Sequence, residues 1–109
     1  MLALYLASAF KVDYFPVRKP GKLPGKVIKG SYTLEYGKDE LEVQDGTIMK
    51  DCKVLIIDDL LATGGTLATT ENLLSKLGAN VIGHYVLFNI TALGGEKKLK
   101  AKVAYSIPL

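Results

Sequence analysis

Two adjacent carboxylates followed by a glycine-containing loop are the clearest candidates for chemistry in this sequence. Asp58 and Asp59 come directly after four aliphatic residues. The loop that follows them in sequence includes Ala62, Thr63, Gly64, Gly65 and Thr66. Glycine lets the backbone approach an anion closely, and threonine hydroxyls add hydrogen-bond donors. Carboxylates suit the vicinal hydroxyls of a ribose, whose neighbouring pyrophosphate can carry Mg²⁺. The pattern therefore predicts a site for a ribose 5-phosphate unit.

The elements that must position this loop can be predicted from the residues on either side. Residues 54–57 are a continuous aliphatic run, which predicts a strand buried on both faces. A helix is expected over about 66–77, with free N–H groups directed at the loop and Thr63 or Thr66 as N-cap. The spacing fits neither G-x-x-x-x-G-K-S/T nor G-x-G-x-x-G, which excludes the NTPase loop and the dinucleotide fingerprint. An ordinary turn whose acids cap the helix is the structural alternative.

A second group of charges follows a short segment near the start of the chain. Residues 12–17 contain two aromatic and two valine side chains, which predicts a strand that ends near Pro16. The cations directly after it are Arg18, Lys19 and Lys22. At the carboxyl end of a strand they would face a second anionic group opposite the glycine loop. The alternative is a solvated basic turn interrupted by two prolines.

The segment between Gly25 and Gly46 alternates like two paired strands and is interrupted at Gly37. This pattern predicts a mobile antiparallel hairpin beside the site, because a glycine-bounded excursion of this length is typical of a functional lid. Residues 81–90 are nearly all apolar and predict an interior parallel strand. Residues 103–107 predict a last strand. Strands alternating with a helix in this way predict a doubly wound, mostly parallel α/β sheet.

Two polar residues inside these elements carry no predicted chemistry. His84, the only histidine, lies within the apolar strand over 81–90, where a packed or surface position is expected. Glu71 falls outside the helix face that Leu67, Thr70 and Leu74 share. Neither residue is therefore predicted to act on a substrate.

Composition limits the class of protein. The chain has 109 residues, 49% of them hydrophobic, which allows one soluble domain. A net charge of +3 suits anionic small molecules, and no basic helix or interleaved aromatic pattern indicates nucleic acid. No apolar run approaches about 18 residues, so no membrane span is predicted. Cys52, the single cysteine, has no partner for an internal disulfide, which favours a reducing compartment and a cytoplasmic location.

Three stretches in chain order resemble the adenine phosphoribosyltransferase family, a branch of the type I phosphoribosyltransferases. They are RKPGKLPG over 18–25, LEYGK over 34–38 and DDLLATGGT over 58–66. The last stretch resembles the family's signature for phosphoribosyl pyrophosphate (PRPP). The resemblance implies conversion of adenine and PRPP into AMP and pyrophosphate in purine salvage, by a cytoplasmic homodimer. Orotate- and hypoxanthine-specific types would keep the loop chemistry but fit residues 34–38 poorly.

The resemblance also implies which residues meet the sugar and its phosphates. Residues 62–66 would bind the 5-phosphate, while Asp58 and Asp59 would bind the ribose. The pyrophosphate group would meet Arg18, Lys19 and Lys22. Mg²⁺ would be the cofactor and would arrive on PRPP, with no direct protein ligand and with water bridging it to the two aspartates.

On the base side, the resemblance implies three further contacts. Glu35 would reach the purine near N7, as general acid or hydrogen-bond partner, and Tyr36 would help to close the site. Ile90 would touch the adenine ring, and residues 94–99 would form the family's next loop and short helix. For a lone glutamate in a hairpin, a solvated surface carboxylate is the alternative.

The resemblance finally implies that the fold is incomplete at its N-terminal side. The family has a first core strand between the segments over 12–17 and 54–57, and a hood over the base, and neither is in this sequence. We therefore expect a partial phosphoribosyltransferase domain over 1–109, with a flexible loop at about 21–46 and the PRPP motif at 54–66. Its opening residues, 2–10, are expected to be the tail of a helix. The alternative function is a truncated, non-catalytic member that binds a phosphoribosyl ligand or a full-length partner subunit.

Overall fold

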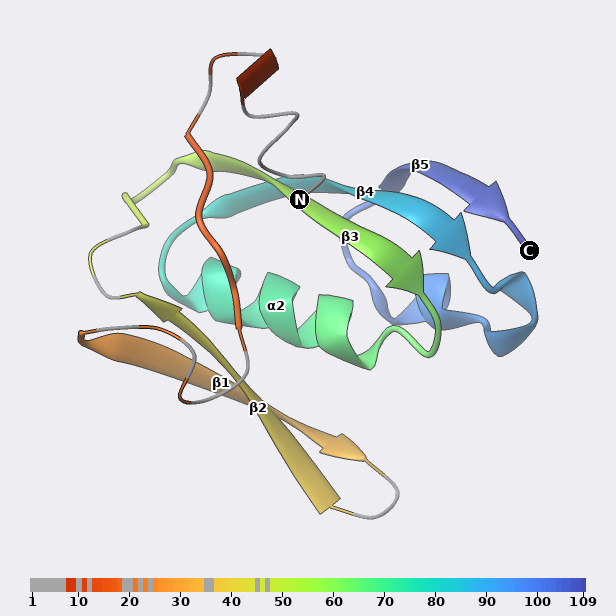
Figure 1. The fold of residues 1–109 in the computed structure, drawn as a ribbon, viewed down its shortest axis with the longest axis horizontal. Coiled ribbons are helices and arrows are strands. Elements are labelled where there is room, and N and C mark those ends of the chain that lie inside the picture. Colours follow the sequence, from red (N-terminus) through yellow and green to blue (C-terminus); the bar gives the residue numbers. More distant parts are fainter. Residues whose placement is uncertain are drawn as a thin grey trace.

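Helix α2 (Gly65–Lys76) lies between two β-layers in the computed structural model of the chain (Figure 1). On one side is a hairpin of β1 (Val27–Leu34) and β2 (Gly37–Gln44), and on the other is a sheet of three strands. The structure describes residues 8–9, 11, 13–18, 21, 23, 25–34, 37–44, 46 and 48–109, without the side chains of 31–34 and 37–39. This arrangement confirms the predicted α/β class with an antiparallel hairpin.

The sheet consists of β3 (Lys53–Leu61), β4 (Asn80–Asn89) and β5 (Val103–Pro108), in that order. Both pairings are parallel, as a helical crossover on one face requires. The middle position of β4 confirms the interior strand predicted from its apolar sequence. Two short 3₁₀ helices, η1 (Thr91–Leu93) and η2 (Gly95–Lys98), connect β4 to β5. β3 is an edge strand, because no strand in the described part of the chain pairs with its other side.

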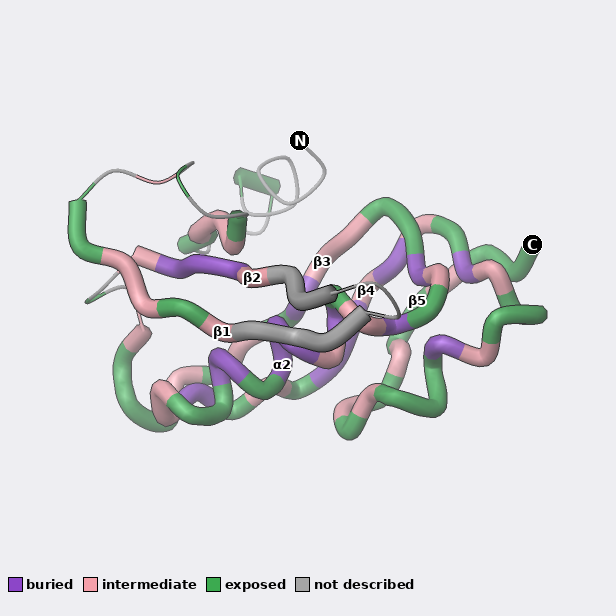
Figure 2. The backbone as a smooth tube through the Cα atoms, turned by 90° about the horizontal axis from the view of Figure 1, so that it is seen from below, coloured by how far each residue is buried: buried purple, intermediate pink, exposed green. Residues whose placement is uncertain are grey.

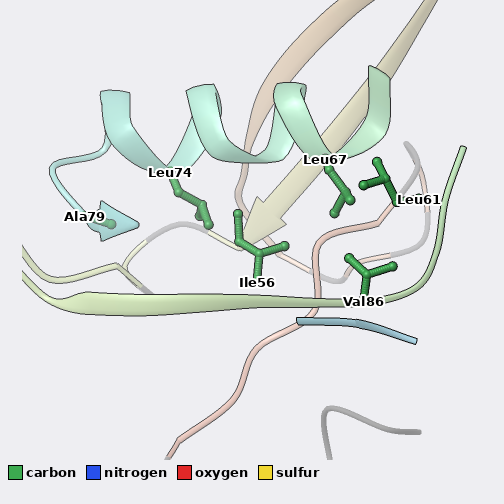
Figure 3. Close-up of a cluster of buried hydrophobic side chains, with 6 residues drawn as sticks. All are labelled: Ile56, Leu61, Leu67, Leu74, Ala79 and Val86. Atoms are coloured by element: carbon green, nitrogen blue, oxygen red, sulfur yellow. The ribbon is translucent and has the colours of Figure 1, made fainter. Parts of the chain in front are cut away.

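The main hydrophobic core lies between the sheet and α2. Figure 3 shows Ile56 and Val86 of the sheet pointing toward the helix, where Leu67 and Leu74 meet them. All four side chains are at most 7% exposed. Burying each aliphatic side chain contributes about 1.5–3 kcal/mol, so this contact fixes the helix against the strand that carries the two aspartates.

The start of α2 differs from the prediction. Gly64 is the N-cap residue, with a φ of 87°, and no side chain caps the helix. The prediction of Thr63 or Thr66 as N-cap is therefore wrong. The physical reason is the left-handed backbone at this position, which glycine adopts readily and a β-branched residue does not. At the other end Gly78 has a φ of 93°, directly after the C-cap residue Leu77.

The hairpin covers the helix face that is turned away from the sheet. β1 and β2 pair antiparallel from Val27 with Gln44 to Leu34 with Gly37. Gly30 approaches α2 so closely that an added Cβ atom would lie 3.2 Å from the Cβ atom of Leu73. The buried stretch of β2 stands out in Figure 2. The predicted hairpin is thus confirmed as a paired layer of the fold.

The strand predicted over residues 12–17 is not found in the described residues of that segment. Residues 13–17 belong to no strand, and Arg18 forms one isolated bridge with Glu42 of β2. Pro16 offers no N–H group to a neighbouring strand, which weakens pairing there. Of the helix predicted over 2–10, only Ser8 and Ala9 are described, both as helical, and the rest lies outside the described residues. No described helix is long and apolar enough to cross a membrane.

Candidate functional site

The two aspartates lie in the carboxyl-terminal part of β3. The backbone N–H of Asp59 donates a hydrogen bond of 2.7 Å to Oδ1 of Asp58. Asp58 is half-buried and Asp59 is exposed. Burial raises the pKa of the Asp58 carboxyl, the hydrogen bond from Asp59 lowers it, and the negative charge of Asp59 raises it again, with a net rise. The exposed Asp59 is therefore the aspartate that is freer to accept hydrogen bonds from a ligand.

The loop after β3 is held by a close backbone contact rather than by a side-chain cap. A Cβ atom on Gly64 would overlap the carbonyl oxygen of Gly95, and a Cβ atom on Gly95 would overlap the carbonyl oxygen of Ala62. Two loops that are far apart in sequence thus meet through glycines. The sequence predicted that Gly64 lets the backbone approach an anion, which stays a prediction, and it did not indicate the contact with Gly95, because the second loop is brought in by tertiary structure.

Ile90 lies beside the same loop. Its backbone N–H donates a hydrogen bond of 2.9 Å to the carbonyl oxygen of Leu61, the last residue of β3. The structure therefore brings together the aspartates, the glycine loop and Ile90 at the carboxyl ends of two neighbouring parallel strands. Ligands of α/β proteins bind at this edge of the sheet.

A cavity of about 650 Å³ opens next to this edge. Asp58 and Thr66 line it, together with Tyr14, Phe15 and Val17 from the N-terminal segment. It lies between that segment and β3, where the resemblance placed the missing first strand. Because Asp58 and Thr66 belong to the predicted ribose and phosphate sites, the cavity and the candidate site share a wall.

The cationic turn is only partly described. Arg18 is exposed, and its backbone exchanges hydrogen bonds of 2.9 and 2.6 Å with Glu42. The carboxylate of Glu42 also accepts a hydrogen bond of 2.8 Å from the N–H of Gly21. Arg18 follows Val17 directly, so it lies next to the cavity wall but does not itself line the cavity. Lys19, Lys22, Glu35 and Tyr36 lie outside the described residues, and their roles stay predictions.

Glu42 is a positioning residue that the sequence did not indicate. It is 3% exposed although it carries a charge. Lys29 is its ion-pair partner at 3.8 Å. The alternation over 40–43 predicted a strand of the hairpin and gave no role to Glu42. Its contacts with the described part of the cationic turn are the backbone pairing with Arg18 and the hydrogen bond from Gly21.

A second buried carboxylate joins helix α2 to β4 and to the segment before β5. Oε2 of Glu71 lies 2.8 Å from Nε2 of His84, which is fully buried in β4. Glu71 also accepts hydrogen bonds of 2.7 and 2.8 Å from the backbone N–H groups of Lys100 and Ala101. The packed position of His84 was expected, but the placement of Glu71 outside the buried face is wrong. The signal for His84 was available, since it is a lone ionisable residue in a nearly apolar strand, but nothing in the mixed sequence of α2 singled out Glu71.

This cluster predicts a loss of stability in acid. Burial alone would raise the pKa of the Glu71 carboxyl, but the hydrogen bonds from His84, Ala101 and Lys100 hold that pKa below its ordinary value of 4.5. A lowered folded pKa stabilises the fold above the unfolded pKa, and this contribution disappears as pH falls through the folded pKa. Urea unfolding at decreasing pH should therefore show a falling free energy of unfolding below about pH 4.5. The Glu71→Gln variant should lack this pH-dependent contribution. If its free energy of unfolding differed from that of the unchanged protein by the same amount at every acid pH, the assignment to Glu71 would be contradicted.

Comparison with known proteins places this geometry in a family. The family model described as a phosphoribosyl transferase domain matches residues 1–108. The adenine phosphoribosyltransferase of Symbiobacterium thermophilum is 46% identical over 98% of this chain, which spans 63% of that relative. The solved adenine phosphoribosyltransferase of Rhodothermus marinus has a TM-score of 0.92 at 38% identity and is covered to 61%.

A third relative was solved with ligands. The Saccharomyces cerevisiae adenine phosphoribosyltransferase, in complex with an imino-altritol bisphosphate and adenine, has a TM-score of 0.86 at 41% identity. This chain covers 56% of that protein, with 91% of its own residues aligned. The chain thus spans 56–63% of the lengths of these relatives. The match to residues 1–108, together with the glycine loop and acid pair at the sheet edge, assigns the chain to the phosphoribosyl transferase domain family.

Proposed function

We propose that this chain carries the PRPP-binding part of an adenine phosphoribosyltransferase, which converts adenine and PRPP into AMP and pyrophosphate. The observation that carries the proposal is the meeting of Asp58, Asp59, the 62–66 loop and Ile90 at one edge of the sheet. In the reaction a base nitrogen forms a bond to the anomeric carbon of the ribose while that carbon's bond to pyrophosphate breaks. Positive charge develops on the sugar, and carboxylates next to the ribose favour such a transition state.

The sugar and its 5-phosphate are assigned to the described part of the site. Asp59 is exposed and accepts hydrogen bonds from the ribose hydroxyls, with Asp58 behind it. Gly64, Gly65 and the first N–H groups of α2 bind the 5-phosphate, because a helix N-terminus offers unpaired donors. Ala62, Thr63 and Thr66 complete the loop around that phosphate.

The base and the leaving group are assigned to the remaining predicted residues. Ile90 gives the adenine an apolar contact next to the loop, and Glu35 and Tyr36 approach the base from the hairpin. Arg18, Lys19 and Lys22 neutralise the pyrophosphate. The relative from Saccharomyces cerevisiae was solved with adenine and a bisphosphate, which supports this pair of ligands.

Mg²⁺ fits this site as a cation carried by the substrate. The two aspartates offer oxygen ligands, which hard cations prefer, but one oxygen of Asp58 already accepts a hydrogen bond from Asp59. The described residues contain no group of three ligating side chains, so a water-bridged contact suits the aspartates better than a full ligand set. When bound, Mg²⁺ would supply charge neutralisation for the diphosphate. We further place the protein in the cytoplasm as a homodimer, in line with the unpaired Cys52 and the family resemblance.

AMP formation from labelled adenine and PRPP with Mg²⁺ tests the proposal directly. Asp59→Asn should weaken PRPP binding about tenfold, because a hydrogen bond to a charged acceptor becomes one to a neutral oxygen. AMP formation at low PRPP should fall in parallel, while the concentration dependence on adenine should change little. The variant also serves as the control for contaminating host enzyme, which would not respond to the substitution. Unchanged PRPP affinity in the variant would contradict the ribose assignment.

A second candidate function is ligand or subunit binding without catalysis. The open edge of β3 and the coverage of 56–63% of the relatives favour it. Under this alternative, PRPP binding would persist and respond to Asp59→Asn, but no labelled AMP would form. Calorimetric titration with PRPP beside the AMP assay therefore distinguishes the two functions.

A further inference from the structure

A second cavity, of about 390 Å³, lies between the hairpin and helix α2, on the side of the helix that is turned away from the sheet (Figure 1). Small-molecule sites typically have volumes of about 300–1,000 Å³, so this cavity is large enough for a small ligand. The hairpin and the helix meet there at Gly30 of β1 and Leu73 of α2, which both line it. None of its described lining residues belongs to the acid pair, the glycine loop or the larger cavity.

Three lysines from three separate elements line this second cavity. Lys29 comes from β1, Lys76 from the last turn of α2, and Lys100 from the segment between η2 and β5. Tertiary structure holds that segment against the helix, because the backbone N–H of Lys100 donates a hydrogen bond of 2.7 Å to Oε1 of Glu71. Three like charges around one cavity repel one another, and an anion between them removes this repulsion.

The other polar lining residues are neutral and come from one face of α2. Thr69, Asn72 and Lys76 are three and four residues apart, which places them on the same side of the helix. Thr69 is only 6% exposed although its side chain is polar. Ser75 adds a second hydroxyl group. Ammonium, amide and hydroxyl groups are all hydrogen-bond donors, so this lining suits the oxygens of a phosphate group.

No carboxylate is among the described residues that line this cavity. Two carboxylates contact its lining residues from outside, and both have other partners. Glu42 lies 3.8 Å from the ammonium group of Lys29 and also accepts a hydrogen bond from Gly21. Glu71 is bound by His84. The Lys29 side chain is 57% exposed, and an ammonium group has three donors, so Lys29 can bind a second anion beside Glu42.

We propose that this cavity, defined by Lys29, Lys76 and Lys100, binds a phosphate group, either as the free ion or as an organic phosphate monoester. A bound phosphate would join the hairpin to the helix, because Lys29 belongs to β1 and the other two lysines lie on the side of α2. The site is separate from the proposed PRPP site. Lys76 is eleven residues after Gly65, which is about 16 Å along a helix at about 1.5 Å per residue. Phosphate binding here therefore does not depend on the proposed transferase function.

Titration of inorganic phosphate into the ¹⁵N-labelled 109-residue chain, followed by its amide resonances, tests the proposal. Chloride keeps the ionic strength constant, so that screening of surface charges does not change during the titration. We expect the resonances of Gly30, Asn72 and Lys100 to shift along one saturable curve, and amide hydrogen exchange in β1 to slow at saturation. The resonances of residues 64–66 report separately on phosphate in the proposed PRPP loop, so the two sites are distinguished.

Glycerol phosphate replaces inorganic phosphate in a second titration. Saturable binding of inorganic phosphate alone would make the occupant the free ion, and binding of glycerol phosphate would make it a phosphate monoester. Both results support a phosphate site. The absence of a saturable curve with either compound overturns the proposal.

Lys76→Gln and Lys102→Gln are a matched pair of variants for these titrations. Each removes one positive charge from an exposed side chain, but only Lys76 lines the cavity. Lys76→Gln should weaken phosphate binding about threefold, as expected for an exposed charge pair, and Lys102→Gln should weaken it less than about 1.5-fold. Thermal unfolding of both variants checks that neither substitution disturbs the fold. Equal weakening in the two variants, or unchanged exchange in β1 at saturating phosphate, would overturn the proposal.

Discussion

Gly64→Ala is expected to weaken PRPP binding about a hundredfold, whereas Gly94→Ala should change it little. Both glycines have a left-handed backbone, with φ of 87° and 63°, so each alanine carries a similar strain of about 1–2 kcal/mol. Their surroundings differ. At Gly64 the new Cβ atom would overlap the carbonyl oxygen of Gly95, while at Gly94 the nearest atom is Cδ of Lys97 at 4.0 Å. Gly64→Ala must therefore displace the loop backbone that is proposed to bind the phosphate.

Calorimetric titration with PRPP measures this difference, and urea unfolding of both variants measures the strain. A misplacement of about 1 Å can cost about a hundredfold in reaction rate, and we expect a loss of similar size in PRPP affinity when the loop donors are displaced. Gly94→Ala, in the loop that Gly64 contacts, is the matched control for left-handed strain. Equal losses of PRPP affinity in the two variants would mean that backbone strain, and not the overlap with Gly95, causes the loss. Full affinity in Gly64→Ala would exclude the loop from the phosphate site.

Elements with a strong local pattern could be predicted from the sequence. The aliphatic run over 54–57 predicted β3, and the apolar run over 81–90 predicted the central position of β4. The acid pair and the glycines predicted that the site would lie where β3 passes into α2. In each case a few consecutive residues carry the information, because strand burial and a left-handed turn restrict residue type locally. The predicted burial of β3 on both faces is wrong, however, since Leu55 is 43% exposed on an edge strand.

The errors arose where a distant segment decides the outcome. Residues 12–17 have strand-forming side chains, but a strand needs a neighbour to pair with, and the described chain supplies only the bridge at Arg18. The cap prediction failed because the N-cap position lies against Gly95 of another loop, where only a residue without a Cβ atom fits. The sequence indicated no role for Glu42, whose carboxylate accepts a hydrogen bond from Gly21, 21 residues away in sequence. Periodicity within one element cannot report these contacts.

Glu71→Ala is expected to lower the free energy of unfolding by about 3–5 kcal/mol, which is close to the stability of many small domains. The carboxylate accepts hydrogen bonds from His84 and from the backbone N–H groups of Lys100 and Ala101. Alanine would leave these donors without their partner, and Nδ1 of the buried His84 already has none among the described residues. An unsatisfied buried donor costs about 1–3 kcal/mol, so several lost together dominate the effect.

Asn72→Ala, at the exposed neighbouring position of α2, is the control for helix propensity and should change stability by less than about 0.7 kcal/mol. Glu71→Gln keeps one acceptor oxygen, so its loss in free energy of unfolding should lie between those of Glu71→Ala and Asn72→Ala.

Amide hydrogen exchange distinguishes a role of this cluster from a simple loss of packing. In Glu71→Gln the N–H groups of Lys100 and Ala101 should exchange faster while those of β3 keep their protection, because the carboxylate joins α2 to the segment before β5 and not to β3. Uniformly faster exchange across the sheet would instead mean that Glu71 stabilises the whole core. In that case the loop over 62–66, which connects β3 to α2, would also become less rigid.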